Sequence, residues 1–160
     1  MTDHRAFNMT VIGASHIKSG TVCQDFSLSC ELPDRRISVV CDGHGGADYF
    51  RSDRGSRFAA EAFTECMKDP DLISVLSASA TQKQQSLRIE QLIKSIIVRW
   101  NELVEQDIKE HPFGADELNC VSEKARRKYE AGQRLQSAYG TTLIGVILTE
   151  NFWLGLQIGD

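Results

Sequence analysis

Two stretches of the chain carry apolar residues at helical spacing. The longer one, Leu87–Lys109, sets a wide apolar stripe against a polar face that holds most of its charges, which predicts a long helix. At about 1.5 Å per residue this helix would span roughly 35 Å. His111-Pro112 is expected to end it. A second apolar face at Phe58–Met67 predicts another helix, which Asp69-Pro70 would end.

Strand patterns lie on both sides of the helical region. Asn8–Ala14 and Phe26–Leu32 mix apolar and polar positions, and Arg36–Cys41 is β-branched and apolar like a buried strand. Thr141–Thr149 and Phe152–Ile158 repeat this character near the end of the sequence. Short turns after Phe26–Leu32 and at Glu150-Asn151 predict two hairpins. Strands, helices and then strands indicate an α+β fold with helices lying on an antiparallel sheet.

Two segments carry no clear strand or helix pattern. Ser74–Gln85 is rich in serine and glutamine, which favours a loop or a fraying helix start. Glu117–Gln136 is polar and charged, and we expect it to lie at the surface. It includes the basic run Lys124–Lys128, which we interpret as a solvated loop or, alternatively, as a surface that docks a partner. The last residues, Gly159-Asp160, directly follow a predicted strand, so we expect the chain to be a fragment.

Composition narrows the function classes. The 160 residues are 41% hydrophobic and 25% charged, as in ordinary globular proteins, and we interpret them as a single domain over 1–160. The net charge of −4 argues against nucleic-acid binding, which usually needs a basic face. No apolar run is long enough for a membrane span or a signal peptide. The five scattered cysteines lack metal-binding spacing, so we expect a reducing, cytoplasmic location.

The densest cluster of candidate functional residues is Asp42-Gly-His-Gly-Gly46, which directly follows the buried strand Arg36–Cys41. Glycines allow sharp turns and close approach of the backbone to a ligand, and a carboxylate at a strand end suits a hard cation. A plain glycine-rich turn, with Asp42 capping the next helix, explains the pattern about as well. Asp25 begins the preceding strand, so pairing of the two strands would bring both carboxylates to one end of the sheet. Two such carboxylates repel each other unless a cation lies between them.

These residues resemble the metal-dependent protein phosphatases of the type 2C family. The pentapeptide at Asp42–Gly46 resembles the family signature, and Ser15–Asp25 resembles the segment that ends in an acidic metal ligand. Tyr139–Leu143 and Leu156–Asp160 resemble two later strands in the same order. The resemblance implies an antiparallel β-sandwich flanked by antiparallel helices. The chain would hold the N-terminal part of this domain, about the first half of the sandwich, and be incomplete at its C-terminus.

The resemblance also implies an activity. The complete protein would hydrolyse phosphoserine and phosphothreonine in phosphoprotein substrates, by a water activated on two or three Mn²⁺ or Mg²⁺ ions. Asp42 would bridge two ions, Gly43 would offer its carbonyl oxygen, and Asp25 and Asp160 would be further metal ligands. His44 would be the general acid, a role that the ordinary pKa of histidine suits.

The sequence departs from the family pattern at three places. Gln24 stands where the family usually has an acidic residue. No arginine lies between Ser15 and Asp25 to grip the substrate phosphate, so Lys18, or alternatively His16, would take that role. The family's later metal-binding aspartates have no counterpart in the chain.

These departures keep two other functions open. One is a catalytically inactive, pseudophosphatase-like or truncated module that binds a phosphoprotein or another partner. The other is a different metallohydrolase that uses His44 as a metal ligand. In either case, half a sandwich would leave an apolar sheet face uncovered, so we expect self-association through that surface.

Overall fold

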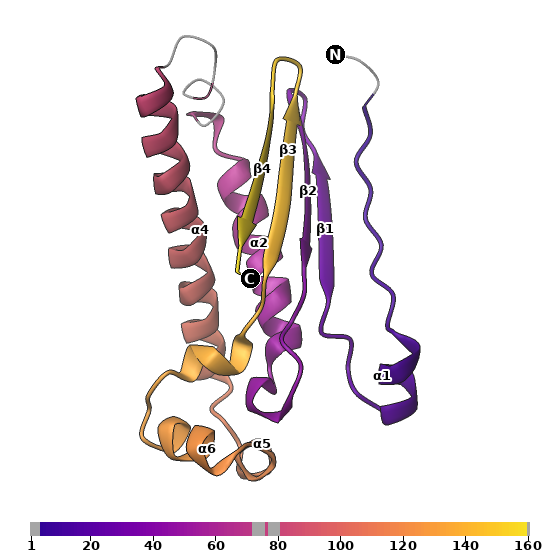
Figure 1. The fold of residues 1–160 in the computed structure, drawn as a ribbon, viewed down its shortest axis with the longest axis vertical. Coiled ribbons are helices and arrows are strands. Elements are labelled where there is room, and N and C mark those ends of the chain that lie inside the picture. Colours follow the sequence, from indigo (N-terminus) through magenta and orange to yellow (C-terminus); the bar gives the residue numbers. More distant parts are fainter. Residues whose placement is uncertain (1–3, 72–75, 77–80, 160) are drawn as a thin grey trace.

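The computed structural model describes residues 4–71, 76 and 81–159. Four antiparallel strands form one sheet in the order β1-β2-β3-β4, and the helices α2 and α4 lie on one of its faces (Figure 1). The elements in chain order are α1 (Ala14–Ser19), β1 (Phe26–Glu31), β2 (Arg35–Cys41), the 3₁₀ helix η1 (Ala47–Tyr49), α2 (Ser52–Met67), α4 (Gln82–Glu110), α5 (Ala115–Cys120), α6 (Glu123–Glu130), the 3₁₀ helix η2 (Leu135–Tyr139), β3 (Leu143–Thr149) and β4 (Trp153–Ile158). The predicted α+β class is therefore confirmed, and the described residues form a single sheet.

Both predicted hairpins are present. In the first, Phe26 of β1 pairs with Cys41 of β2, and the turn closes through hydrogen bonds between Leu32 and Arg35. In the second, β3 pairs with β4, and Thr149 N–H donates to the Phe152 carbonyl across the predicted turn at Glu150-Asn151. Pairing of β2 with β3 joins the hairpins across the sheet centre. All three pairings are antiparallel.

The core lies between the sheet and the two long helices. Alternate residues of β2 and β3 point into it, and Ile37 and Ile147 are fully buried there. From the helical side, Phe63 and Met67 of α2 and Ile96 of α4 complete the same cluster. Every second residue of the strands and one face of α2 are apolar, and together they form one continuous buried layer.

Helix α4 extends the predicted helix Leu87–Lys109 at its start. Thr81 caps it: the Thr81 hydroxyl accepts a hydrogen bond from the Gln84 N–H, while the Gln84 side chain accepts one from the Thr81 N–H. Residues 82–85 of the segment Ser74–Gln85 are thus helical, whereas 74, 75 and 77–80 lie outside the described residues. The apolar stripe is narrower than predicted, because Ile97 is 42% exposed.

The predicted strand Asn8–Ala14 is wrong. This segment runs alongside β1, on the side away from α2 and α4 (Figure 1), and its hydrogen bonds to β1 come from side chains. The Asn8 amide donates to the Ser27 carbonyl at 3.0 Å, and the hydroxyls of Thr10 and Ser27 lie 2.7 Å apart. Alternating polarity therefore reflects a segment lying alongside a strand, without the backbone ladder of a strand pair.

The loop interpretation of Lys124–Lys128 is also wrong, because these residues belong to α6. The segment Glu117–Gln136 does lie at the surface, as expected, but it is mostly helical and well anchored. The side chains of Ala125 and Tyr129, four residues apart, are buried on one face of α6. A polar helix needs only such a narrow apolar face to pack.

The outer face of the sheet carries exposed apolar side chains near its centre and at β4. Val40, Ile144 and Val146 are 40–55% exposed, and Trp153 is 72% exposed. Self-association through this face stays a prediction. Among the described helices, none is long and apolar enough to cross a membrane.

We expect Gly145→Ala to destabilise the fold. A Cβ at Gly145 would lie 2.3 Å from the ring of Phe63, which is 1% exposed and has no room to move. Such overpacking costs about 2 kcal/mol of unfolding free energy, measurable by urea denaturation. The matched control is Gly155→Ala on the adjacent strand, whose Cβ would meet Trp153 at an ordinary 3.5 Å. Equal stability of the two variants would contradict this packing.

Candidate functional site

Asp25 and Asp42 lie side by side at one end of the sheet. They flank the paired residues Phe26 and Cys41, so the β1–β2 register places them opposite each other. Both line a pocket of about 450 Å³ whose other walls come from β1, β2, β3 and the N-terminal segment, including Thr10 and Thr142. The structure thus brings together the two carboxylates that the sequence singled out.

The two carboxyl groups interact directly. Partial burial raises the pKa of Asp25 above its ordinary value, and the negative charge of Asp42 and a hydrogen bond with its carboxyl group raise it further. His16 of α1 acts in the opposite direction. A carboxylate pair in this state is stabilised by a positive charge between or beside its oxygens.

The backbone around Asp42 is fixed by the segment that leads into β3. The Asp42 carbonyl accepts hydrogen bonds from the Thr142 N–H and the Thr141 hydroxyl, both at 2.9 Å. His44 N–H donates to the Gly140 carbonyl, also at 2.9 Å. The loop predicted to bind metal, residues 42–46, is therefore held at Asp42 and at His44 by the segment that leads into β3.

Gly43 is enclosed by backbone. Its N–H donates to the Gln24 carbonyl at 3.1 Å, and a Cβ at this position would lie 2.5 Å from that oxygen and 2.7 Å from the Ser52 carbonyl. Only glycine fits there. The role of the Gly43 carbonyl as a metal ligand stays a prediction.

Gln24 connects three parts of the site. Its amide nitrogen donates to the Ser52 hydroxyl at 2.8 Å and to the His44 carbonyl at 3.2 Å. The segment before β1 is thereby bound to the loop after β2 and to the first residue of α2. The position that departs from the family pattern thus has a structural role in this protein.

The side chains of His44 and Lys18 lie outside the pocket. The His44 ring packs edge-on against Tyr49, with ring centroids 5.1 Å apart, and touches the backbone at Gly140. Lys18 is exposed on α1. In the described part of the chain neither side chain lines the pocket, so the structure does not bring them together with the carboxylates.

Asp160 lies outside the described residues. Gly159, directly before it, has a φ of +101°, and a Cβ there would lie 3.0 Å from the Thr142 side chain. Thr142 lines the pocket. The end of β4 therefore runs past the same corner of the sheet as Asp25 and Asp42.

The acidic pair fits a divalent cation. Carboxylate oxygens are the donors that Mn²⁺ and Mg²⁺ prefer, and the repulsion within the pair would be relieved by such an ion. The adjacent pocket leaves room for water molecules. Counting only residues that the structure describes, no group of three or more His, Cys, Asp and Glu side chains could hold a metal ion.

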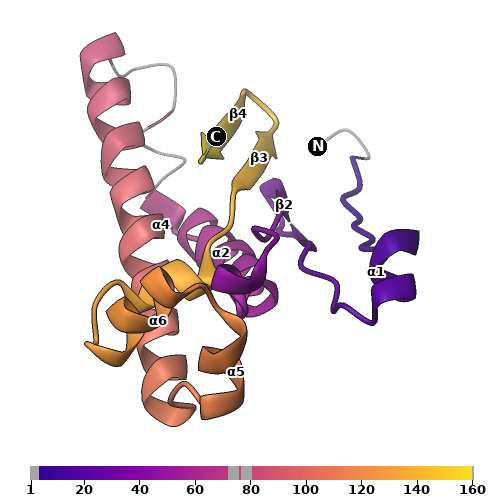
Figure 2. The same ribbon diagram turned by 60° about the horizontal axis from the view of Figure 1, so that its bottom comes forward.

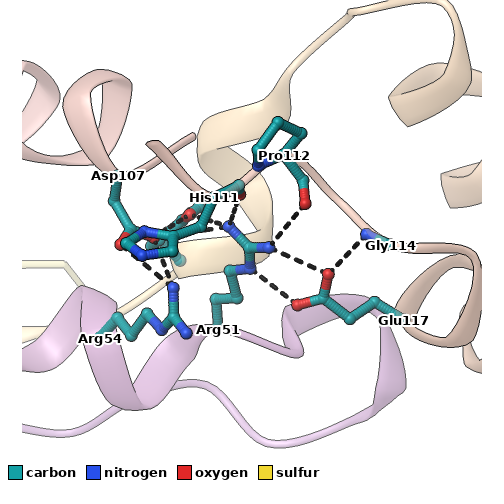
Figure 3. A network of polar contacts seen from close by, with 8 residues as sticks. Arg51, Arg54, Asp107, His111, Pro112, Gly114 and Glu117 are labelled. Atoms are coloured by element: carbon teal, nitrogen blue, oxygen red, sulfur yellow. Dashed lines mark hydrogen bonds and ion pairs between the residues drawn. The ribbon is translucent and has the colours of Figure 1, made fainter. Parts of the chain in front are cut away.

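A buried arginine fixes the far end of the loop that starts at Asp42. Arg51 directly precedes α2, and it is 4% exposed. Its guanidinium binds both carboxylate oxygens of Glu117 on α5, at 2.8 and 2.9 Å (Figure 3). It also donates to the Tyr139 hydroxyl and the His111 carbonyl, each at 2.7 Å, and lies 4.7 Å from the ring centroid of Phe113.

This cluster holds α5 against the residue that precedes α2. Figure 2, which brings that end of the molecule forward, shows α5 and α6 near the start of α2. Tyr139 links the cluster back to the pocket, since the next residue, Gly140, accepts the hydrogen bond from His44. The Tyr139 hydroxyl donates to Asp107 of α4 at 2.6 Å. Loop, helices and β3 are thus held in one polar network.

Sequence reasoning missed this network. Arg51, Asp107 and Glu117 are widely separated along the chain and follow no motif, and the resemblance of Tyr139–Leu143 to a family strand does not indicate the partners of the Tyr139 hydroxyl. The one available signal was the position of Arg51, a charged residue between the glycine-rich loop and a predicted helix rich in alanine.

We expect acid to weaken the fold through this network. Burial favours the neutral acids, but hydrogen bonds from Arg51 to Glu117, and from Tyr139 and Arg54 to Asp107, lower the pKa of both groups below their ordinary values of 4.5 and 3.8. Their ionised forms therefore stabilise the folded state. This stabilisation is fully present above about pH 4.5 and is lost as the pH falls through the lowered values.

Glu117→Gln tests this directly. It should lower the unfolding free energy at pH 7 by about 2 kcal/mol, since it leaves Arg51 short of one negative partner, and it should flatten the acid dependence. Urea denaturation between pH 3 and 7 measures both. The control is Glu123→Gln, which removes an exposed partner of Arg127 on α6 and should change stability by less than about 0.5 kcal/mol. A Glu117→Gln protein with unchanged stability would show that Arg51 does not need this charge.

Comparison with known proteins places the chain in a family. Neither the curated proteins nor the solved structures gave a match to this chain. A family model described as protein phosphatase 2C matches residues 12–160, which include Asp25, the glycine-rich loop and the strand ends around the pocket. With this match over nearly its whole length, the chain belongs to the protein phosphatase 2C family.

Proposed function

We propose that this protein is a metal-dependent protein phosphatase that hydrolyses phosphoserine and phosphothreonine. The observation that supports this most is the contact between Asp25 and Asp42 beside an open pocket. Two carboxylates held in this way would be stabilised by a cation, and family membership favours Mn²⁺ or Mg²⁺.

The chain's own residues would hold and orient the ions. Asp25 and Asp42 would supply carboxylate oxygens, and Gly43 its carbonyl. The hydrogen bonds from Thr141 and Thr142 to the Asp42 carbonyl would keep that loop from shifting when an ion binds. When bound, the ions supply a water of lowered pKa and neutralise charge on the phosphate.

Two further side chains would act on the substrate. His44 would donate a proton to the leaving oxygen, which requires its ring to turn away from Tyr49 toward the pocket. His16 or Lys18 would attract the phosphate. His16 is favoured because it already interacts with Asp25, whereas Lys18 is exposed to solvent on α1.

The first experiment is hydrolysis of an aryl phosphate by the purified chain with and without Mn²⁺. We expect turnover that requires metal and that falls at least about 100-fold in Asp42→Asn. Asp116→Asn, which changes the same charge on the exposed start of α5, is the matched control and should keep full activity.

Metal binding gives a second readout that does not depend on turnover. Saturating Mn²⁺ should raise the unfolding temperature of the wild type and of Asp116→Asn by about 5 °C, and that of Asp42→Asn much less. Turnover that persists without metal, or equally in Asp42→Asn, would rule out the proposed mechanism. Phosphopeptide binding that needs no metal and leads to no turnover would instead support a catalytically inactive binding module.

A further inference from the structure

We infer that the exposed basic face of α6 docks acidic residues that flank the phosphorylated residue of a substrate. The inference rests on the proposed phosphatase function and extends it to the class of substrate. Three observations carry it: α6 is rigidly attached to the loop that carries Asp42, it presents unpaired positive charge, and it lies within a short peptide's length of the pocket.

The attachment of α6 runs through Asp48 of η1. The carboxylate of Asp48 accepts hydrogen bonds from the N–H and the hydroxyl of Ser122, at 2.7 and 2.8 Å, directly before the first residue of α6. Tyr129, near the end of the helix, donates its hydroxyl to the Asp48 carbonyl at 2.8 Å. Its ring is buried against Phe50 and Phe113. One residue of the loop thus holds both ends of α6.

The outward side of α6 is basic. The helix contains four cationic and two acidic side chains, in a chain whose net charge is −4. Arg126 pairs with Glu130, and Arg127 pairs with Glu123.

Two lysines on α6 have no such partner. The side chains of Lys124, which is exposed, and Lys128, which is half-buried, make no hydrogen bond or ion pair with any residue that the structure describes. They lie four residues apart, so they are neighbours on one side of the helix. Like charges at this spacing destabilise a helix slightly, and an acidic partner would turn that cost into an attraction.

The distance to the candidate site suits a single peptide. Asp48 follows Asp42 by six residues, which span at most about 20 Å when fully extended. Lys124 is two residues beyond the Ser122 contact. A substrate with its phosphoresidue at the pocket would therefore reach Lys124 and Lys128 with side chains within about eight positions of the phosphate. Carboxylates at those positions complement the lysines, and the negative charge of the chain as a whole disfavours a long polyanion such as RNA.

The test measures binding, so it does not depend on turnover. Fluorescence anisotropy compares a phosphoserine peptide that carries several glutamates beside the phosphoserine with the same peptide carrying glutamines. The purified chain is used with Mn²⁺, as the wild type, as Lys124→Glu/Lys128→Glu, and as the control Lys83→Glu/Lys94→Glu. The control makes the same change in net charge on exposed lysines in the first half of α4, a helix whose start lies at the opposite end of the molecule from α6 (Figure 1).

We expect the wild type and the control to bind the glutamate peptide about tenfold more tightly than the glutamine peptide at about 10 mM salt. The difference should shrink at about 150 mM salt, and Lys124→Glu/Lys128→Glu should abolish it. Equal affinities for the two peptides in the wild type would overturn the inference. So would an equal loss in both double variants, or competition by a single-stranded oligonucleotide as strong as that by the glutamate peptide.

Failure of this inference and failure of the proposed function give different results. Metal-dependent hydrolysis of the aryl phosphate, together with no preference between the peptides, would overturn only the docking role of α6. A peptide preference that depends on Lys124 and Lys128, in a chain that hydrolyses no phosphomonoester, would support docking and overturn the phosphatase proposal.

Discussion

Taking a guanidinium ion out of water is unfavourable unless its N–H groups find acceptors, and Arg51 finds them where several segments of the chain meet. Its acceptors are a carboxylate of α5, the end of α4 and the Tyr139 hydroxyl. None of these groups can move far without leaving a buried charge unpaired. The position of α5, the entry into β3 and the end of the glycine-rich loop therefore all depend on one side chain.

The same requirement links stability to the candidate site. Tyr139 is bound by Arg51, and the residues that follow it hold Asp42 and His44 through their backbone. At the opposite end of α2 from Arg51, Arg35 donates to the carbonyls of Met67 and Asp69. Each end of α2 thus lies against a buried arginine, which keeps the helix in one position along the sheet. The acidic pair is built on this rigid frame.

Local patterns were enough to predict much of this fold. The long apolar face of α4 and the two hairpins follow from periodicity and turn residues that lie close together in the sequence. The start of α4 was also readable, because Thr81 and Gln84 form a capping-box pattern. The opposition of Asp25 and Asp42 followed from one predicted hairpin.

The rest depends on contacts between distant residues. The alternation in Asn8–Ala14 is the same for a strand and for a segment bound by its side chains, so sequence alone could not separate them. Helices α5 and α6 are short and polar, and the residues that position them, Arg51 for α5 and Asp48 for α6, come from a distant part of the chain. The ring of His44 packs against Tyr49, and no sequence motif indicates this contact.

The amide of Gln24 gives one of the departures from the family pattern a physical meaning. Both groups that it contacts, the Ser52 hydroxyl and the His44 carbonyl, receive a hydrogen from it, and a carbonyl oxygen can only accept. A carboxylate at position 24 could accept a hydrogen bond from the Ser52 hydroxyl, but it would have no hydrogen to give the His44 carbonyl. The link from this residue to the glycine-rich loop therefore depends on the direction of a hydrogen bond and not on a negative charge. In this protein, the residue before Asp25 holds the glycine-rich loop in place by hydrogen bonds and adds no negative charge beside the acidic pair.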